Sequence, residues 1–174
     1  MQVKGKLLIV DDEKDIHEIL EVMLTDVVTE IEHAFDGKEA LEKIIAGNFH
    51  SVLSDINMPK LNGLDLLKEV RTQGHHVPFV ILTAFGDKEK AVEALKLGAF
   101  DFLDKPWEEE NLKDVVGRSL ELGLYLDKFS KTPEALGELL EVHDENRKSS
   151  IEYLQKIIQN LAYDNQSLRK KIEQ

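Results

Sequence analysis

Polar side chains that could carry out chemistry follow apolar runs at four places in the chain. They are carboxylates, a hydroxyl and a lysine, found at Asp11-Asp12-Glu13, Asp55, Thr83-Ala84 and Asp104-Lys105-Pro106. Three carboxylates in one crevice would repel one another strongly, and a hard cation such as Mg²⁺, which prefers carboxylate, carbonyl and water ligands, would relieve that repulsion. A lysine and a hydroxyl beside such a cation indicate that an oxyanion also binds. A phosphoryl group meets all of these demands.

The apolar runs that precede these residues have the character of buried parallel strands. Five such runs occupy residues 6–10, 28–34, 52–55, 79–82 and 100–103. Between them apolar residues recur at helical spacing, and a fifth helix is expected from near Trp107 onward. Strict alternation of five strands with five helices predicts a doubly wound α/β fold with a parallel sheet. Such sheets bind ligands in the crevice at the carboxyl ends of their strands, where the polar residues would meet.

The alternative explanation for these residues is that loops at strand ends are polar in any protein. That explanation suffices for a polar residue at one strand end. It does not account for four strand ends whose side chains suit a single chemistry. The pattern therefore favours a site.

The composition is that of a globular protein with an acidic first part. Of the 174 residues, 42% are hydrophobic and 32% charged, and none is cysteine, which excludes disulfides and thiolate metal sites. Residues 130–174 hold 7 Lys and Arg against 8 Asp and Glu, so the first 129 residues carry −11 of the net charge of −12. An acidic domain repels phosphate backbones, so we expect no direct DNA binding. Without a leader pattern or a run of about 18 apolar residues, we expect a cytoplasmic protein that does not enter the membrane.

A seven-residue repeat runs through the last part of the chain. Its members are mainly isoleucine at one position and leucine at the other, at Ile151, Leu154, Ile158, Leu161, Asn165, Leu168 and Ile172. This choice favours a parallel two-stranded coiled coil, whose register the single Asn165 would fix. We therefore predict a helical extension over 130–174, with a coiled coil over about 150–174 that pairs two chains. A single amphipathic helix packed on its own domain is the alternative.

Four motifs around the polar residues resemble those of response-regulator receiver domains, the CheY-like superfamily of two-component signalling. They are Leu8-Ile9-Val10-Asp11-Asp12-Glu13, Asp55-Ile56-Asn57-Met58-Pro59, Leu82-Thr83-Ala84 and Phe102-Leu103-Asp104-Lys105-Pro106. The resemblance covers roughly residues 4–125, and we predict a receiver domain over 1–129. It implies a flavodoxin-like sheet of order 2-1-3-4-5. It also implies a regulator, not an enzyme, that receives its phosphoryl group from a sensor histidine kinase or a phosphotransfer protein.

The resemblance assigns roles at the phosphorylation site. Asp55 would be the phosphoacceptor, which attacks a phosphohistidine as a carboxylate nucleophile and becomes an acyl phosphate. Asp12 would bind Mg²⁺ directly, and Asp11 largely through water. Asp55 itself and the backbone carbonyl of Asn57 would complete the protein ligands.

The resemblance also implies a switch. Lys105 would pair with the phosphoryl oxygens, and the Lys105–Pro106 peptide bond is typically cis in the family. Thr83 would move to hydrogen-bond the phosphoryl group, and Phe102 would follow it inward. Phe102 stands where many relatives have tyrosine, so its inward state gains packing without a hydrogen bond.

A second function class shares much of this chemistry. Mg²⁺-dependent phosphatases of the dehalogenase type also use an aspartyl phosphate, a threonine and a lysine, but they need an Asp-x-Asp motif on the first strand. Here the first strand ends in adjacent aspartates, Asp11 and Asp12. The sequence leaves the output open, since the chain could act through partners or be the front of a longer protein whose effector follows the coiled coil.

Overall fold

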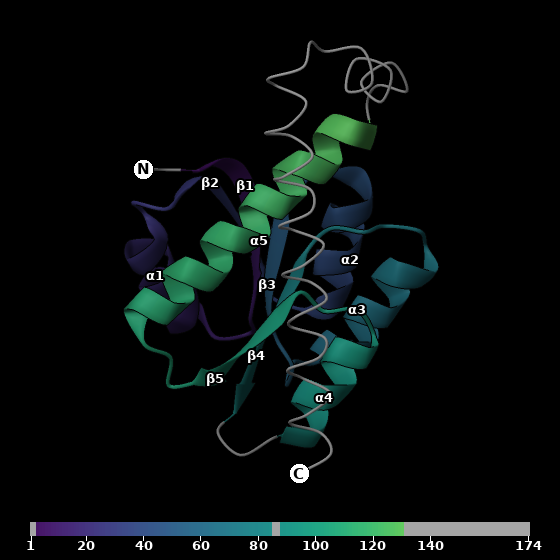
Figure 1. Cartoon of the computed structure of the whole chain (residues 1–174). Coiled ribbons are helices and arrows are strands. Elements are labelled where there is room, and N and C mark those ends of the chain that lie inside the picture. The colour runs from purple at the N-terminus through teal and green to yellow at the C-terminus, as the bar shows by residue number, and fades with distance from the viewer. Residues whose placement is uncertain (1–2, 85–87, 131–174) are drawn as a thin grey trace. The chain divides into compact units, whose positions relative to one another are not determined.

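The computed structural model describes residues 3–84 and 88–130, which form a parallel sheet with helices on both faces (Figure 1). The strands are β1 (Val3–Val10), β2 (Val28–Ala34), β3 (Ser51–Asp55), β4 (Phe79–Ala84) and β5 (Asp101–Lys105). The helices are α1 (Lys14–Leu24), α2 (Gly37–Ala46), α3 (Gly63–Thr72), α4 (Lys88–Lys96) and α5 (Glu109–Ser130). The sheet order is β2-β1-β3-β4-β5 and all neighbours are parallel, which confirms the predicted fold class.

Two predictions concern features beyond this sheet. The seven-residue repeat lies outside the described residues, so the coiled coil and the division of the chain at residue 129 stay predictions. None of the described helices is long and apolar enough to cross a membrane.

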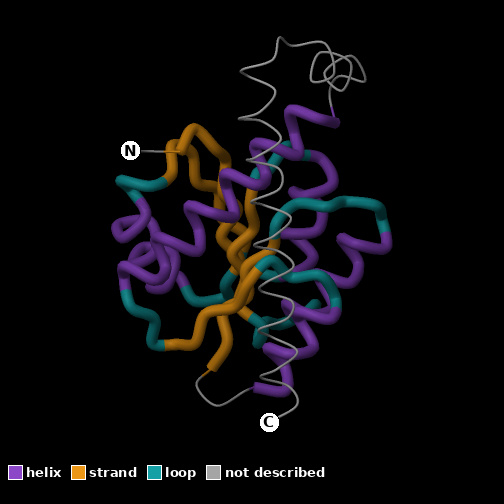
Figure 2. Tube along the Cα trace, viewed as in Figure 1, coloured by secondary structure: helices purple, strands orange, loops and turns teal. Residues whose placement is uncertain are grey.

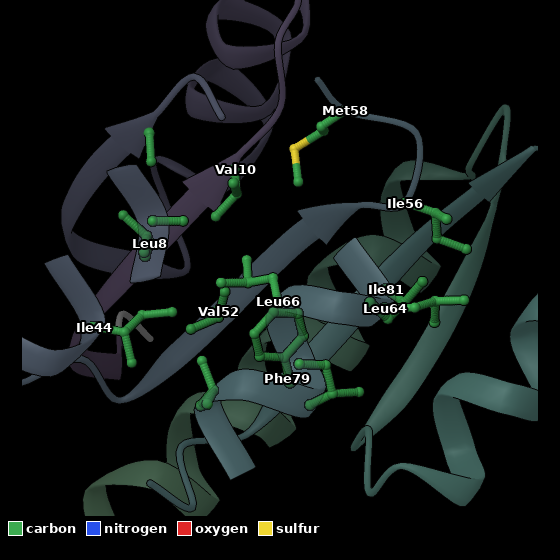
Figure 3. Packing of buried hydrophobic residues seen from close by; sticks show 14 of the residues in the cluster. Leu8, Val10, Ile44, Val52, Ile56, Met58, Leu64, Leu66, Phe79 and Ile81 are labelled. Atoms are coloured by element: carbon green, nitrogen blue, oxygen red, sulfur yellow. The ribbon is translucent and has the colours of Figure 1, made fainter. Parts of the chain in front are cut away.

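Two apolar layers cover the two faces of the sheet, because successive strand residues point to opposite faces. Leu8 and Val10 of β1 belong to the layer that α2, α3 and α4 cover (Figure 3). Leu7 and Ile9 belong to the other layer, which α1 and α5 cover. Figure 2 shows the strands enclosed between these two groups of helices. The central strands are thus buried on both faces, which is why their sequences are continuous apolar runs.

Four strands, β1, β3, β4 and β5, and the helix α5 have boundaries that differ from the sequence prediction. β5 begins at Asp101, one residue later than predicted, and continues to Lys105. The added residues are polar, and backbone pairing with the end of β4 keeps them in the sheet. α5 begins at Glu109 rather than near Trp107. The Trp107 indole N–H instead donates to Met23 Sδ at 3.4 Å, which anchors the loop before α5 on α1.

α5 makes a close approach to the start of β3 at Gly123. A Cβ atom at this position would lie 1.6 Å from the carbonyl oxygen of His50, the residue before β3. One turn earlier in the helix, the buried hydroxyl of Ser119 lies 2.7 Å from that of Ser51. The missing side chain of Gly123 therefore lets the helix come close enough for the two serines to pair.

We predict that Gly123→Ala lowers the free energy of unfolding by about 1–3 kcal/mol, because the new methyl group fits only if α5 moves away from β3. Gly117→Ala in the same helix is the matched control, since its Cβ would meet only Val27 Cγ1, at 3.9 Å. That change should be neutral or stabilising by up to about 1 kcal/mol through helix propensity. Urea unfolding of both variants measures the difference, and equal effects would contradict the close approach.

Candidate functional site

The carboxyl ends of four strands bring the predicted site residues to one edge of the sheet. Asp55 is the last residue of β3, Lys105 is the last of β5, and Asp11 directly follows β1. Thr83 is the last residue but one of β4. β1 and β3 are neighbours, and β4 lies between β3 and β5. The fold therefore makes this edge the place where these side chains can meet.

One lysine joins the two buried carboxylates of this edge. Lys105 Nζ lies 2.7 Å from Asp55 Oδ1 and 3.1 Å from Asp11 Oδ2. Asp11 is 1% exposed and Asp55 6% exposed, so water screens their charges little. Lys105 reaches across the end of β4 to make both contacts, which takes a long side chain. The Lys105–Pro106 peptide bond is cis, as the resemblance implies.

The two carboxylates keep Lys105 charged. Burial by itself lowers the pKa of the Lys105 ammonium, but the hydrogen bonds and charges of Asp55 and Asp11 outweigh burial and raise it above its ordinary value of 10.5. A raised lysine pKa means that the ion pairs contribute their full stability below the unfolded-state pKa. That contribution is lost as the pH rises through the raised pKa of the folded state.

Backbone groups of the loop after β3 hold the Asp55 carboxylate. The Asn57 N–H donates to Asp55 Oδ2 at 2.6 Å, so each carboxylate oxygen has a donor. The loop turns back where the Gly63 N–H donates to the Ile56 carbonyl at 2.9 Å. A Cβ atom at Gly63 would lie 2.2 Å from the Asp55 carbonyl oxygen, so this turn requires glycine.

A second ion pair ties the same loop to the start of α2. Lys60, which has a φ of 66°, pairs with Asp36, and Asp36 also caps α2 by accepting two N–H groups of its first turn. The hydrogen bond from Lys60 is the main reason why the pKa of Asp36 lies below its ordinary value. The loop after β3 is thus anchored by its own backbone and by this neighbouring helix.

The predicted metal ligands differ in their surroundings. Asp11 Oδ1 accepts the Glu13 N–H at 2.9 Å, while Asp12 is exposed at the rim. Within residues 3–84 and 88–130, no group of three or more His, Cys, Asp or Glu side chains is arranged to hold a metal ion. The side chains of Asp11 and Asp55 are brought together around the Lys105 ammonium, and Asp12 is not part of that cluster.

The predicted switch residues lie on the two strands β4 and β5. Thr83 is fully buried, and its hydroxyl donates to the carbonyl of Ala84 at 3.0 Å rather than to a carboxylate. Phe102 is half-buried and packs against the apolar layer under α2 and α3. Thr83 thus lies at the carboxyl edge with its hydroxyl bonded away from Asp55, whereas Phe102 lies near the start of β5, in register with Ile81.

Two further contacts of the site were not predicted from the sequence. Lys90 Nζ in α4 donates to Asn57 Oδ1 at 3.2 Å, and nothing in the local sequence indicates this contact. His17 Nε2 in α1 lies 2.7 Å from the backbone oxygen of Asp11. His17 precedes the buried Leu20 by three residues, so helical spacing placed it on the inner face and could have revealed it.

The model of one protein family, the response regulator receiver domain, matches residues 7–117. The chain belongs to this family. Its members are the phosphorylation-linked regulators of two-component systems, and this receiver domain is one of them. The match supports that function and gives no support to a dehalogenase-type phosphatase. Response regulators are in general signalling proteins rather than enzymes.

Relatives of this receiver domain include named regulators from several bacteria. The transcriptional regulatory protein DltR of Streptococcus agalactiae is 42% identical over 107 residues, which are 62% of this chain and 48% of DltR. The transcriptional regulatory protein FixJ of Bradyrhizobium diazoefficiens is 35% identical over 116 residues, which are 67% of this chain and 57% of FixJ. The chain thus spans about half the length of these curated relatives.

Solved receiver structures agree with the fold. The receiver domain of the Francisella response regulator 1452 superposes with a TM-score of 0.64 at 34% identity, and the match covers 68% of this chain and 98% of that domain. The chemotaxis response regulator CheY4 of Vibrio cholerae gives a TM-score of 0.62 at 35% identity, with 67% and 99% coverage. The similarity thus spans the whole of these shorter chains.

We predict that Lys105→Met lowers the free energy of unfolding of this receiver domain by about 2 kcal/mol at neutral pH, because two buried carboxylates lose their shared counter-charge. The deficit relative to wild type should be constant from neutral pH to about pH 10 and shrink at higher pH, where wild-type Lys105 also loses its charge. Lys68→Met, at an exposed position of α3, is the control. Urea unfolding across pH measures both, and a Lys105→Met variant as stable as the control would contradict the role of the ion pairs.

Proposed function

We propose that Asp55 accepts a phosphoryl group from the phosphohistidine of a sensor histidine kinase or a phosphotransfer protein. An Asp55 oxygen attacks phosphorus, the new O–P bond forms as the N–P bond breaks, and the donor imidazole leaves. The observation that carries the proposal is the buried Asp55 carboxylate at the carboxyl edge of the sheet, with Lys105 Nζ at 2.7 Å. A cation at this distance is placed to offset the charge of the incoming phosphoryl oxygens.

The residues present fit a magnesium ion. Receiver domains in general bind Mg²⁺ at the phosphorylation site. Here Asp11 and Asp55 share one ammonium, so the buried pair keeps an excess negative charge, and all the candidate donors are oxygens, as Mg²⁺ prefers. We assign Asp11, Asp12, Asp55 and the backbone carbonyl of Asn57 as the protein ligands. When bound, Mg²⁺ would offset the carboxylate charge and polarise the phosphoryl oxygens.

The conformational change that would follow phosphorylation uses two residues that could exchange their present contacts, Thr83 and Phe102. The Thr83 hydroxyl donates to a carbonyl one residue away, so rotation about one side-chain bond frees it for a phosphoryl oxygen. Phe102 is only half-buried and gains burial if it moves inward after Thr83. We propose that these two residues pass the phosphorylation state of Asp55 to the surface of α4 and β5.

The output of the whole protein is a separate proposal. We infer that residues 130–174 form a helical extension whose coiled coil over about 150–174 makes a parallel homodimer. Direct DNA binding by the receiver part is disfavoured by its net charge of −11. The names of DltR and FixJ describe transcriptional regulators about twice as long as the part of them that this chain matches.

We predict that acetyl phosphate with Mg²⁺ adds one phosphoryl group per chain and that Asp55→Asn abolishes this labelling, because an amide is a poor nucleophile. Asp104→Asn is the matched control, since Asp104 neighbours Lys105 but has an exposed side chain. Intact mass spectrometry measures the added mass, and EDTA should prevent it in the wild type. Labelling that persists in Asp55→Asn, or rapid turnover of many phosphomonoesters, would refute the assignment.

We predict that the full chain is a dimer in solution and that Leu161→Asp makes it a monomer, because a charge at a seam position cannot be buried. Gln159→Asp, at an outward position of the same repeat, is the control and should stay dimeric. Light scattering gives the mass, with and without phosphorylation, for these chains and for one cut after residue 130. Monomers in every state for both lengths would exclude the coiled coil.

A further inference from the structure

Two histidines form a hydrogen-bonded chain that ends at the phosphorylation site. His17 of α1 is buried, with 4% exposure, and its Nε2 lies 2.7 Å from the backbone oxygen of Asp11. Its other ring nitrogen, Nδ1, lies 2.8 Å from Nδ1 of His33 in β2. The two rings meet edge to face, with centroids 4.9 Å apart and ring planes at 70°.

The Asp11 carbonyl fixes the direction of its own hydrogen bond and, for the neutral form of His17, also that of the bond between the two rings. A backbone carbonyl can only accept, so His17 Nε2 carries the hydrogen. The Nδ1 atom of a neutral His17 is then an acceptor, and the Nδ1 of His33 must be the donor. His33 keeps that hydrogen whether or not its Nε2 is also protonated, so the chain does not depend on the charge of His33. The order is His33 to His17 to Asp11.

The carbonyl at the end of this chain controls the aim of two acidic side chains. β1 makes its last pair with β3 at Val10, so the Asp11 carbonyl has left the ladder and needs another donor. This carbonyl and the Asp12 N–H belong to one planar peptide unit. A bond that fixes the plane therefore sets the directions in which Asp11 and Asp12 leave the backbone.

We propose that His17 is a positioning residue for magnesium binding, and that His33 holds His17 in the tautomer this task requires. The inference rests on the proposed function, because it concerns the ligands of the same ion. Groups that hydrogen-bond the ligands of a metal ion typically change its affinity by about 10–100-fold when they are removed. His17 fits that description, since its only described task toward the site is to hold the peptide between two ligands.

The surroundings keep the two rings in place. The Phe35 ring packs against His17 with centroids 4.6 Å apart, and the Lys43 ammonium donates to the His33 carbonyl at 2.5 Å. In the sheet, His33 pairs in register with Ile9, two residues before Asp11. The hydrogen-bonded chain of the two histidines therefore joins three elements, α1, β1 and β2, whose mutual positions the core already fixes.

The test compares variants that keep a donor with variants that lose it. His17→Gln places an amide N–H where Nε2 was, whereas His17→Leu has a similar volume and no donor. His33→Asn and His33→Leu form the same comparison one step further from the site. His50→Leu is the matched control, because His50 also bonds a backbone group, the Lys6 N–H at 3.0 Å, but lies before β3 at the opposite end of the sheet.

The measured quantity is the dissociation constant for Mg²⁺, from calorimetric titration of the full chain. We expect His17→Leu to bind Mg²⁺ roughly 10-fold more weakly or worse, and His17→Gln to recover most of the loss. His33→Leu should show a smaller loss in the same direction. His50→Leu should lower stability in urea and leave the dissociation constant unchanged, which separates positioning from general destabilisation.

A spectroscopic measurement tests the chain directly. Long-range ¹H–¹⁵N spectra of the histidine rings should show a neutral His17 with its hydrogen on Nε2 and a His33 with a hydrogen on Nδ1. A His17 with its hydrogen on Nδ1 would overturn the inference even if a variant failed to fold.

The outcomes separate the two proposals. If the wild-type chain binds Mg²⁺ and becomes phosphorylated, while His17→Leu and His33→Leu bind the ion equally well, the positioning role is wrong and the proposed function stands. If the wild-type chain binds no Mg²⁺, the proposed function fails and takes this inference with it. A weaker Mg²⁺ affinity in His17→Leu, together with a near wild-type affinity in His17→Gln, supports both the proposed function and the positioning role.

Discussion

The ammonium group of Lys105, shared between the carboxylates of Asp55 and Asp11, is the contact on which this edge of the sheet depends. Two carboxylates with almost no solvent exposure would otherwise face each other at high electrostatic cost. The contact is possible because the strand order puts β1 beside β3 and leaves only β4 between β3 and β5. A side chain as long as lysine can cross one strand end, so the contact requires both the parallel strand order and a long cationic residue at position 105.

Backbone N–H groups provide the other hydrogen bond of each of the two carboxylates. Each carboxylate has one oxygen toward Lys105 and the other toward an N–H two residues further along the chain, from Asn57 for Asp55 and from Glu13 for Asp11. These donors need no rearrangement when the charge at the site changes, which is the property of a preorganised polar environment. Gly63 serves the same end, since its turn keeps the loop backbone against Asp55.

The sequence predicted the features that depend on a local pattern of residues. The apolar runs predicted the strands, and the polar residues that ended them predicted which residues share an edge, because a parallel sheet aligns its carboxyl ends. Contacts that depend on register were not predictable. His33 meets His17 only because β2 pairs with β1 in a particular register, and Lys60 meets Asp36 only after the loop has folded. Ile19 lies at helical spacing from Ile16 and Met23 and is nevertheless 44% exposed, so periodicity placed the helix but not its exact face.

The distribution of these contacts indicates which side of the site can move. On the β1–β2 side, the peptide after Asp11 is held by His17, and His17 is held by His33, so motion there would break buried hydrogen bonds in sequence. On the β4–β5 side, β5 is an edge strand, and Thr83 uses only a neighbouring carbonyl. One ammonium cannot stay equally close to Asp11 and to a phosphoryl group that brings further negative charge to Asp55. On the proposed function, the least costly response would be for Lys105 and the ends of β4 and β5 to adjust while Asp11 and Asp12, after β1, stay in place. That response would direct the signal toward α4 and β5.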